Sequence, residues 1–285
     1  MEVNNAKDYQ LDRLRVLAIG PAGSGKTTQL RTLPGKKLLF CFEDNALNSL
    51  KGDPSIDYKL YLPDTVEIAP RSLSTKQNVR ATPATGEKPK AFDSFVHDFN
   101  GFLHDEEMFA SYDIVAIDSL TSLGKAVMDA VLWLNNRMGQ QPAMDDWGAQ
   151  LNTIENTVRK ITSLPKMVYV TAHDMLMQDD LTKKVVNELV LTGQLKVRIP
   201  MLFSDIFKFV CEGDSYQILT RPDRYNIKVR RSIQHLEPEI DCTIKNFDTP
   251  ENYGLGSLLV RAGYTANFRQ SKTGISSKQS IQEVK

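Results

Sequence analysis

A glycine-rich stretch near the start of the chain has the residue types and spacing that bind a phosphate group. Residues 15–28 read RVLAIGPAGSGKTT and fit the pattern G-x-x-x-x-G-K-[ST] through Gly20, Gly25, Lys26 and Thr27. Glycines permit backbone angles that turn consecutive N–H groups toward an anion, and the lysine ammonium adds a full positive charge. The Thr27 hydroxyl is a ligand for Mg²⁺. We therefore predict a nucleotide site, the alternative being a fortuitous glycine turn. The predicted nucleotide-binding residues are Gly20, Pro21, Ala22, Gly23, Ser24, Gly25, Lys26, Thr27 and Thr28.

A second motif supplies a carboxylate for the metal ion. Residues 112–120 read YDIVAIDSL, in which four apolar residues lead into Asp118. Such a strand places its terminal acid beside Mg²⁺, together with the hydroxyl of Thr27. The alternative is that Asp118 only caps the following helix, expected over 120–136. Ser119 follows the acid, where many other nucleotide-driven motors carry a glutamate as general base, so the base must come from elsewhere.

Two further strand ends offer that base and a phosphate sensor. The apolar run 38–42 ends on Glu43 and Asp44, and either could orient the attacking water or belong to a solvated turn. The run 167–171 is followed by His173, which would lie close to the γ-phosphate and report its presence. The alternatives for His173 are a turn histidine or, more weakly, a metal ligand.

The elements that must position these residues follow from hydrophobic periodicity. Short strands are predicted at 16–19, 38–42, 112–120 and 167–171, with an edge strand at 58–62. Helices are predicted from 27 to 33, from 91 to 104, from 120 to 136, and from the acids at 145–146 up to Pro165. Residues 63–90 lose periodicity and read as a long surface loop, with a net charge of +2 from residue 64 onward.

After residue 179 the pattern changes to short strands. Runs at 183–191, 206–211, 216–220 and 226–230 are predicted strands, and a small helix is predicted at 252–262. The last predicted hairpin, 221–231, has a net charge of +4. Its cations Arg221, Lys228 and Arg230 could reach the phosphates of a neighbouring subunit or a nucleic-acid backbone, or form a solvated edge.

The totals set limits on the protein class. The chain has 35 basic and 35 acidic side chains, so any nucleic-acid contact must use a local patch. Its three cysteines are far apart and form no C-x-x-C pair, which favours reduced thiols. The first ten residues are polar, and no apolar run approaches the ~20 residues of a membrane span. We therefore expect an intracellular protein of the cytoplasm without membrane contact.

With these motifs in place, the chain resembles the RecA-like P-loop ATPases, and more narrowly the phage nucleotide-binding proteins that include single-strand annealing recombinases. The matching segments are GPAGSGKTT at Gly20, LLFCFEDNAL around Glu43, DIVAIDSLTSL at Asp118 and VYVTAHD at His173. The resemblance spans about residues 12 to 232. It departs at the second strand, where Glu43 and Asp44 compete for the position of the catalytic glutamate.

The resemblance implies an α/β fold of the RecA type. We expect three αβα layers around a mainly parallel central sheet that antiparallel strands extend. The ATPase domain would cover 12–263 with the insertion 63–90, between an N-terminal arm at 1–11 and a disordered polar tail at 264–285. ATP and Mg²⁺ would be the ligands, and the cytoplasm of the host cell the location if a phage encodes the chain.

The leading functional hypothesis is an ATPase of phage DNA recombination or replication, whose nucleotide state controls subunit packing and the binding or annealing of single-stranded DNA. Its partners would be single-stranded DNA, further copies of itself in a homo-oligomer and a single-strand DNA-binding protein. In this hypothesis Lys26, Glu43 or Asp44, Asp118 and His173 form the catalytic set. The alternative is a nucleotide-gated scaffold that hydrolyses ATP negligibly and recruits other phage proteins. A small-molecule kinase is disfavoured because no arginine-rich lid is evident.

Overall fold

The computed structural model describes residues 14–63, 88–138, 140–178, 183–233 and 236–261. The predicted arm at 1–11, nearly all of the predicted surface loop at 63–90 and the predicted tail at 264–285 lie outside these residues. No helix among the described residues has the length and apolar character needed to cross a lipid bilayer.

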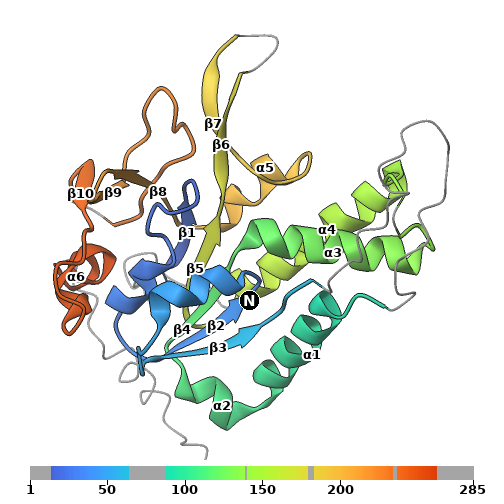
Figure 1. The fold of residues 1–285 in the computed structure, drawn as a ribbon, viewed down its shortest axis with the longest axis horizontal. Coiled ribbons are helices and arrows are strands. Elements are labelled where there is room, and N and C mark those ends of the chain that lie inside the picture. The colour runs from blue at the N-terminus through green and yellow to red at the C-terminus, as the bar shows by residue number, and fades with distance from the viewer. Residues whose placement is uncertain (1–13, 64–87, 139, 179–182, 234–235, 262–285) are drawn as a thin grey trace, which may run out of the picture.

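An eight-stranded sheet forms the centre of the molecule, in the order β10-β9-β8-β1-β5-β4-β2-β3 (Figure 1). The strands from β8 to β3 in this order are parallel, and β9 and β10 extend the sheet antiparallel at one edge. Both the α/β class and the mainly parallel sheet with an antiparallel extension are confirmed. The strand bounds are β1 Arg15–Ile19, β2 Lys37–Cys41, β3 Ile56–Leu60, β4 Ile114–Asp118, β5 Met167–Ala172, β8 Asp205–Glu212, β9 Ser215–Leu219 and β10 Glu239–Asp241.

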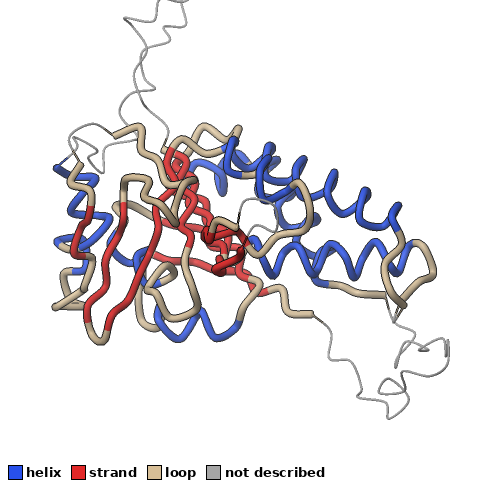
Figure 2. The backbone as a smooth tube through the Cα atoms, turned by 90° about the horizontal axis from the view of Figure 1, so that it is seen from above, coloured by secondary structure: helices blue, strands red, loops and turns tan. Residues whose placement is uncertain are grey.

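Helices cover both faces of this sheet (Figures 1 and 2). One face packs against α1 Ala91–His104, α3 Leu120–Leu134, α4 Met144–Thr162 and α5 Leu195–Arg198. The other face packs against two 3₁₀ helices, η2 Thr28–Thr32 and η3 Asp44–Leu50, and against α6 Gly254–Arg261. Smaller elements are α2 Glu106–Ser111, η5 Pro200–Leu202 and η6 Pro250–Asn252.

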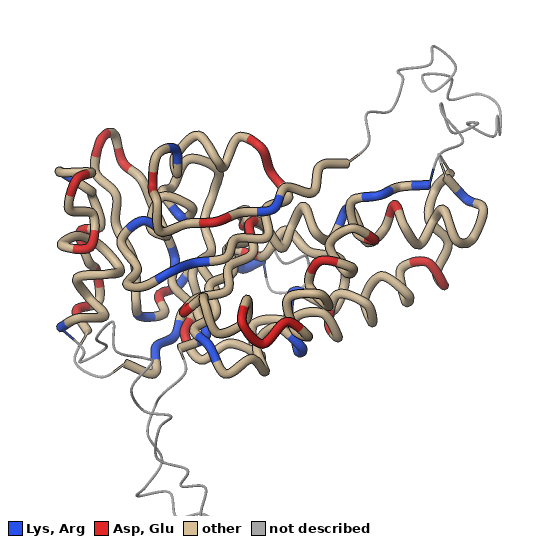
Figure 3. Tube along the Cα trace, turned by 90° about the horizontal axis from the view of Figure 1, so that it is seen from below, with Lys and Arg blue, Asp and Glu red and all other residues tan. Residues whose placement is uncertain are grey.

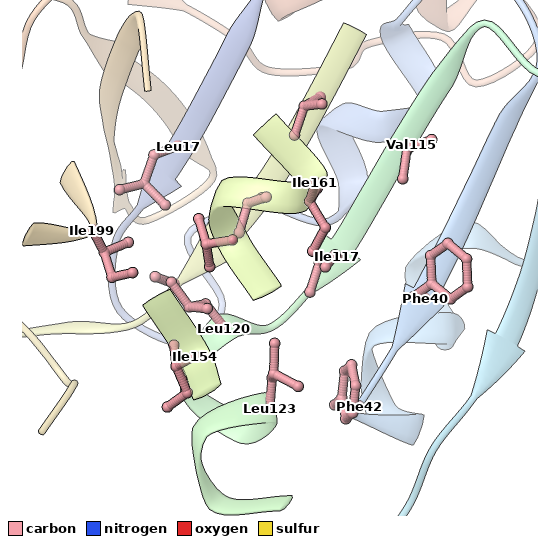
Figure 4. Close-up of a cluster of buried hydrophobic side chains, with 14 of the residues drawn as sticks. Leu17, Phe40, Phe42, Val115, Ile117, Leu120, Leu123, Ile154, Ile161 and Ile199 are labelled. Carbon is pink, nitrogen blue, oxygen red and sulfur yellow. The ribbon is translucent and has the colours of Figure 1, made fainter. Parts of the chain in front are cut away.

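The larger apolar cluster joins the sheet to the helices on one of its faces. Leu17, Phe40, Val115 and Ile117 project from three strands toward side chains of α3 and α4 (Figure 4). The ring of Phe40 also meets phenylalanines of α1 edge to face, with a centroid distance of 5.5 Å to Phe95. Edge-to-face packing adds to the energy of burial, so the phenylalanines of α1 anchor that helix on the sheet.

Three predicted elements differ in the structure. The segment predicted as a helix at 27–33 is the short 3₁₀ helix η2, ended by the Pro34-Gly35 turn. The prediction of a strand at 226–230 is wrong, because these residues form an irregular loop with a single β-bridge between Arg230 and Ile206. The predicted basic hairpin at 221–231 is therefore a loop that follows β9.

A two-stranded hairpin stands apart from the main sheet and projects from the top of the molecule in Figure 1. Its strands are β6 Asp174–Gln178 and β7 Val185–Leu189. The second lies within the alternating run predicted at 183–191, whereas the first was missed. Because β6 begins directly after His173, the hairpin is connected to the end of β5.

Candidate nucleotide-binding site

The predicted phosphate loop connects the end of β1 to η2. Gly23 and Gly25 have φ angles of +77° and +84°, a region that side chains with a Cβ rarely adopt. Within the described part of the chain, the N–H groups of Gly25, Lys26 and Thr27 donate to no protein acceptor. Such N–H groups are suited to oxygens of a phosphate, so the backbone of the loop fits the predicted ligand.

The ammonium group of Lys26 is held inside this loop. It donates to the carbonyl oxygens of Gly20 and Pro21 at 2.8 and 2.7 Å. The side chain is nearly fully buried, and burial lowers its pKa to about 8, against the opposing charge of Asp118. The lysine is therefore placed where a phosphate would replace the two carbonyl oxygens as its partner.

Asp118 lies at the end of β4, and its two carboxylate oxygens have different partners. Thr27 donates its hydroxyl to Oδ2, and Thr171 donates its hydroxyl to Oδ1 at 2.5 Å. Asp118 is 2% exposed, and burial raises its pKa. A buried acid beside a hydroxyl offers the oxygen ligands that Mg²⁺ prefers, so Thr27 and Asp118 fit the predicted metal site.

The sheet order explains how residues far apart in sequence meet. Strand β5 lies between β1 and β4, so its end contacts both the phosphate loop and the metal-side acid. Tyr169 of β5 donates its hydroxyl to the carbonyl oxygen of Lys26 at 2.7 Å. Asp118 is in register with Cys41 of β2, two residues before Glu43.

Glu43 contacts the residues that follow Asp118 and the end of β5, whereas Asp44 does not. Oxygen Oε1 of Glu43 accepts hydrogen bonds from the hydroxyls of Ser119 and Ser122 and lies 3.2 Å from Nε2 of His173. These contacts, led by the one with His173, lower the pKa of Glu43 to about 2. Asp44 is exposed at the start of η3. The structure thus brings Lys26, Thr27, Asp118, Glu43 and His173 together.

The predicted trans-acting cations lie in the loop after β9, and two of them have partners in the same chain. Lys228 pairs with Glu188 of β7 at 2.5 Å. Arg230 donates to the carbonyl oxygens of Pro200 and Phe203. Arg221 is exposed.

The polar residues that hold the site together were missed from the sequence. Thr171, Ser122 and Tyr169 carry no motif, since threonine, serine and tyrosine are common at such positions. Their signal is positional only: Thr171 is the second-to-last residue of β5, two residues before His173, and Ser122 lies one helical turn after Ser119 in α3.

Together the fold and the site define a P-loop ATPase domain, with the phosphate loop on β1 and the metal-side acid on β4. Comparison with known families agrees: residues 12–231 match the AAA domain family, and the chain belongs to that family. Among solved structures it is similar to the flagellar accessory protein FlaH from Methanocaldococcus jannaschii. That similarity has 13% sequence identity and a TM-score of 0.35, and covers 81% of this chain and 85% of the other. No curated protein matches the sequence.

Proposed function

We propose that this protein binds ATP with Mg²⁺ and hydrolyses it. The observation that carries the proposal is the convergence of Lys26, Thr27, Asp118 and Glu43 beyond the carboxyl ends of β1, β4 and β2, with β5 lying between β1 and β4. The hydroxyl of Thr27 bonded to the carboxylate of Asp118 is the contact on which the metal site rests. Bound Mg²⁺ would neutralise charge that develops on the phosphates.

Each residue has a chemical role that its position supports. Lys26 neutralises the β- and γ-phosphates, and Thr27 and Asp118 hold the metal ion. Glu43 orients the attacking water, because its carboxylate lies beside the end of β4. His173, in contact with Glu43 at 3.2 Å, senses whether the γ-phosphate is present.

We further propose that the nucleotide state controls binding of single-stranded DNA in phage recombination or replication, and that the protein acts as a homo-oligomer. The sequence resemblance to phage annealing proteins supports this role. Basic and acidic residues are both spread along the described trace (Figure 3), so contact with DNA would need a local group of cations. The loop 221–231, with its exposed Arg221, is the group we favour.

The proposal is tested by measuring ATP turnover with and without single-stranded DNA, for the wild-type protein and for Lys26→Ala. We expect DNA-stimulated turnover that the substitution abolishes. Lys37→Ala is the matched control, because Lys37 is also a buried lysine on the sheet but lies at the opposite end of β2 from Glu43. Normal hydrolysis by Lys26→Ala would show that the mechanism is wrong.

One observation favours a second function, a nucleotide-gated scaffold with negligible hydrolysis. The carboxylate of Glu43 accepts two hydroxyl hydrogen bonds and contacts His173, and its pKa of about 2 makes it a weak base. Tight ATP binding without turnover in the presence of DNA would select the scaffold over the motor.

A further inference from the structure

A second buried lysine lies next to the phosphate loop, and the proposed catalytic roles leave it without a task. Lys208 of β8 pairs with Asp174 at 2.5 Å, and the side chains are 6% and 2% exposed. A buried ion pair of this kind gives little net stability, because removing both charges from water costs about as much as their attraction returns. Stability therefore does not explain why an ion pair lies next to the phosphate loop, and a functional role would.

The backbone places Lys208 beside the first residue of the loop. Lys208 is in register with Ile19, the last residue of β1 before Gly20. A β-carbon added at Gly20 would lie only 2.6 Å from the carbonyl oxygen of the next β8 residue, Phe209. Strand β8 thus runs in contact with the start of the phosphate loop, on the side of β1 opposite to β5.

The charges of this pair reach the loop lysine. The Asp174 carboxylate raises the pKa of Lys26, and the Lys208 ammonium lowers it. Both groups therefore lie close enough to Lys26 to act on its charge. Asp174 also follows His173 directly, so it belongs to the strand end that we propose senses the γ-phosphate.

We propose that Lys208 is a second phosphate-binding lysine, supplied by the same chain, which pairs with Asp174 when no nucleotide is bound and turns to the γ-phosphate when ATP binds. This inference rests on the proposed ATP binding and names a further residue of that site. ADP lacks the γ-phosphate, so Lys208 would keep its pair with Asp174 in the ADP state. The exchange of one anion for another leaves the Lys208 ammonium partnered in both states, whereas the Asp174 carboxylate loses its ion pair when ATP is bound.

The first experiment measures affinity for a non-hydrolysable ATP analogue and for ADP, each with Mg²⁺. The variant is the double substitution Lys208→Met with Asp174→Asn, which removes both charges and leaves no unpaired ion. A hydrogen bond to a charged group corresponds to about a tenfold change in affinity or more. We expect about a tenfold loss for the ATP analogue and less than about a twofold loss for ADP.

Lys37→Met is the matched control, since Lys37 is a buried lysine on β2 that donates to Ser55 far from the loop. It should leave the ratio of the two affinities unchanged. An equal loss for both nucleotides in the double variant, or no loss, would overturn the inference. If the wild-type protein binds neither nucleotide, the proposed function itself fails.

A second experiment uses the unaltered protein. An ATP derivative acylated on its γ-phosphate transfers the acyl group to a nearby lysine amine: the neutral amine attacks the carbonyl carbon, the bond between that carbon and the phosphate oxygen breaks, and an amide forms as ATP leaves and the amine loses a proton. Mass spectrometry should find Lys208 acylated along with Lys26, and excess ATP should suppress both. Acylation of Lys26 without Lys208 would contradict the inference.

Discussion

At the scale of single residues, the adjacent acids Glu43 and Asp44 differ by one position in the chain, and their side chains point to different surroundings. The backbone leaves β2 after Cys41, and the following turn aims Glu43 at Ser119 and His173 while Asp44 faces solvent at the start of η3. The sequence alone left both residues as candidates for the acid that orients water. The geometry favours Glu43.

Substitution of each acid by its amide tests this assignment. Glu43→Gln keeps the size of the side chain but removes its charge, so we expect turnover to fall by about 100-fold or more with ATP binding retained. Asp44→Asn, the matched control, should stay within about twofold of the wild type in turnover. A larger loss in Asp44→Asn than in Glu43→Gln would reverse the assignment.

The burial of Lys26 predicts a pH dependence of nucleotide affinity. Burial lowers the pKa of this ammonium to about 8, so the charged form that phosphate needs is lost as the pH rises through that value. Between pH 7 and pH 9 we expect the affinity for an ATP analogue to fall by about tenfold, because one proton must be regained on binding. Titration calorimetry across this range measures it.

Lys26→Arg is the control for that measurement, since a guanidinium stays charged throughout the range. The variant should show a flat profile whatever its absolute affinity. A wild-type profile that is equally flat would contradict the lowered pKa.

Sequence motifs predicted the residues of the phosphate loop and the acid Asp118 but not the polar residues that support them. Gly20 to Thr27 and Asp118 have fixed spacing and neighbours, because phosphate and metal chemistry admits few side chains at those places. The contacts of Thr171 and Ser122 depend on strand order, which no local pattern encodes. His173 was placed by its position after a strand, and its contact with Glu43 could not be inferred.

At the scale of elements, the parallel strands and the three long helices α1, α3 and α4 were predicted, since periodicity reports burial directly, whereas the short helix α5 was not. The run at 226–230 alternates like a strand, yet Asn226 is held by Asp223 and the chain there forms a loop. Side-chain hydrogen bonds to the backbone compete with strand pairing, and alternation does not reveal them. The hairpin strand β6 was missed because DMLMQ lacks β-branched residues.

The contact between η2 and α6 has a consequence for stability. A β-carbon at Gly256 of α6 would lie 1.8 Å from the carbonyl oxygen of Thr32, and the N–H of Gly256 donates to the Thr32 hydroxyl at 3.0 Å. We expect Gly256→Ala to lower the free energy of unfolding by about 1–3 kcal/mol, because the two elements must separate. Urea denaturation measures the change.

Gly148 on the exposed side of α4 provides the matched control. A β-carbon there meets no atom within 4 Å. Gly148→Ala should raise the free energy of unfolding, by up to about 1 kcal/mol, since alanine is the better helix former. Equal effects of the two substitutions would show that α6 does not pack closely on η2.

At the scale of the whole molecule, the fold extends beyond the part that matches the family. The match ends at residue 231, but β10 and α6 follow it and complete the sheet and its second face. Gln29 of η2 binds both segments, donating to the carbonyl oxygen of Cys242 at 2.8 Å and accepting from the N–H of Leu255 at 2.9 Å. The C-terminal segment therefore supports the element that follows the phosphate loop.

Truncation tests this support. A chain that ends at residue 231 should lose cooperative unfolding and ATP binding, because the apolar face under Leu255, Leu258 and Leu259 becomes exposed. A chain that ends at residue 261 keeps every residue of the site and should bind ATP as the full chain does. Scanning calorimetry and ATP binding are the measurements, and normal binding by the shorter chain would contradict the expectation.

Lys26, which donates hydrogen bonds within its own loop, suggests a compromise between stability and function. The Lys26 ammonium is buried, and its partners are uncharged: the carbonyl oxygens of Gly20 and Pro21 and the hydroxyl of Ser24. An apolar side chain at this position would make the protein more stable, but it would remove the charge that is proposed to bind phosphate. The loop thus holds a buried charge without an anionic hydrogen-bond partner, and the phosphate of the proposed nucleotide would supply one.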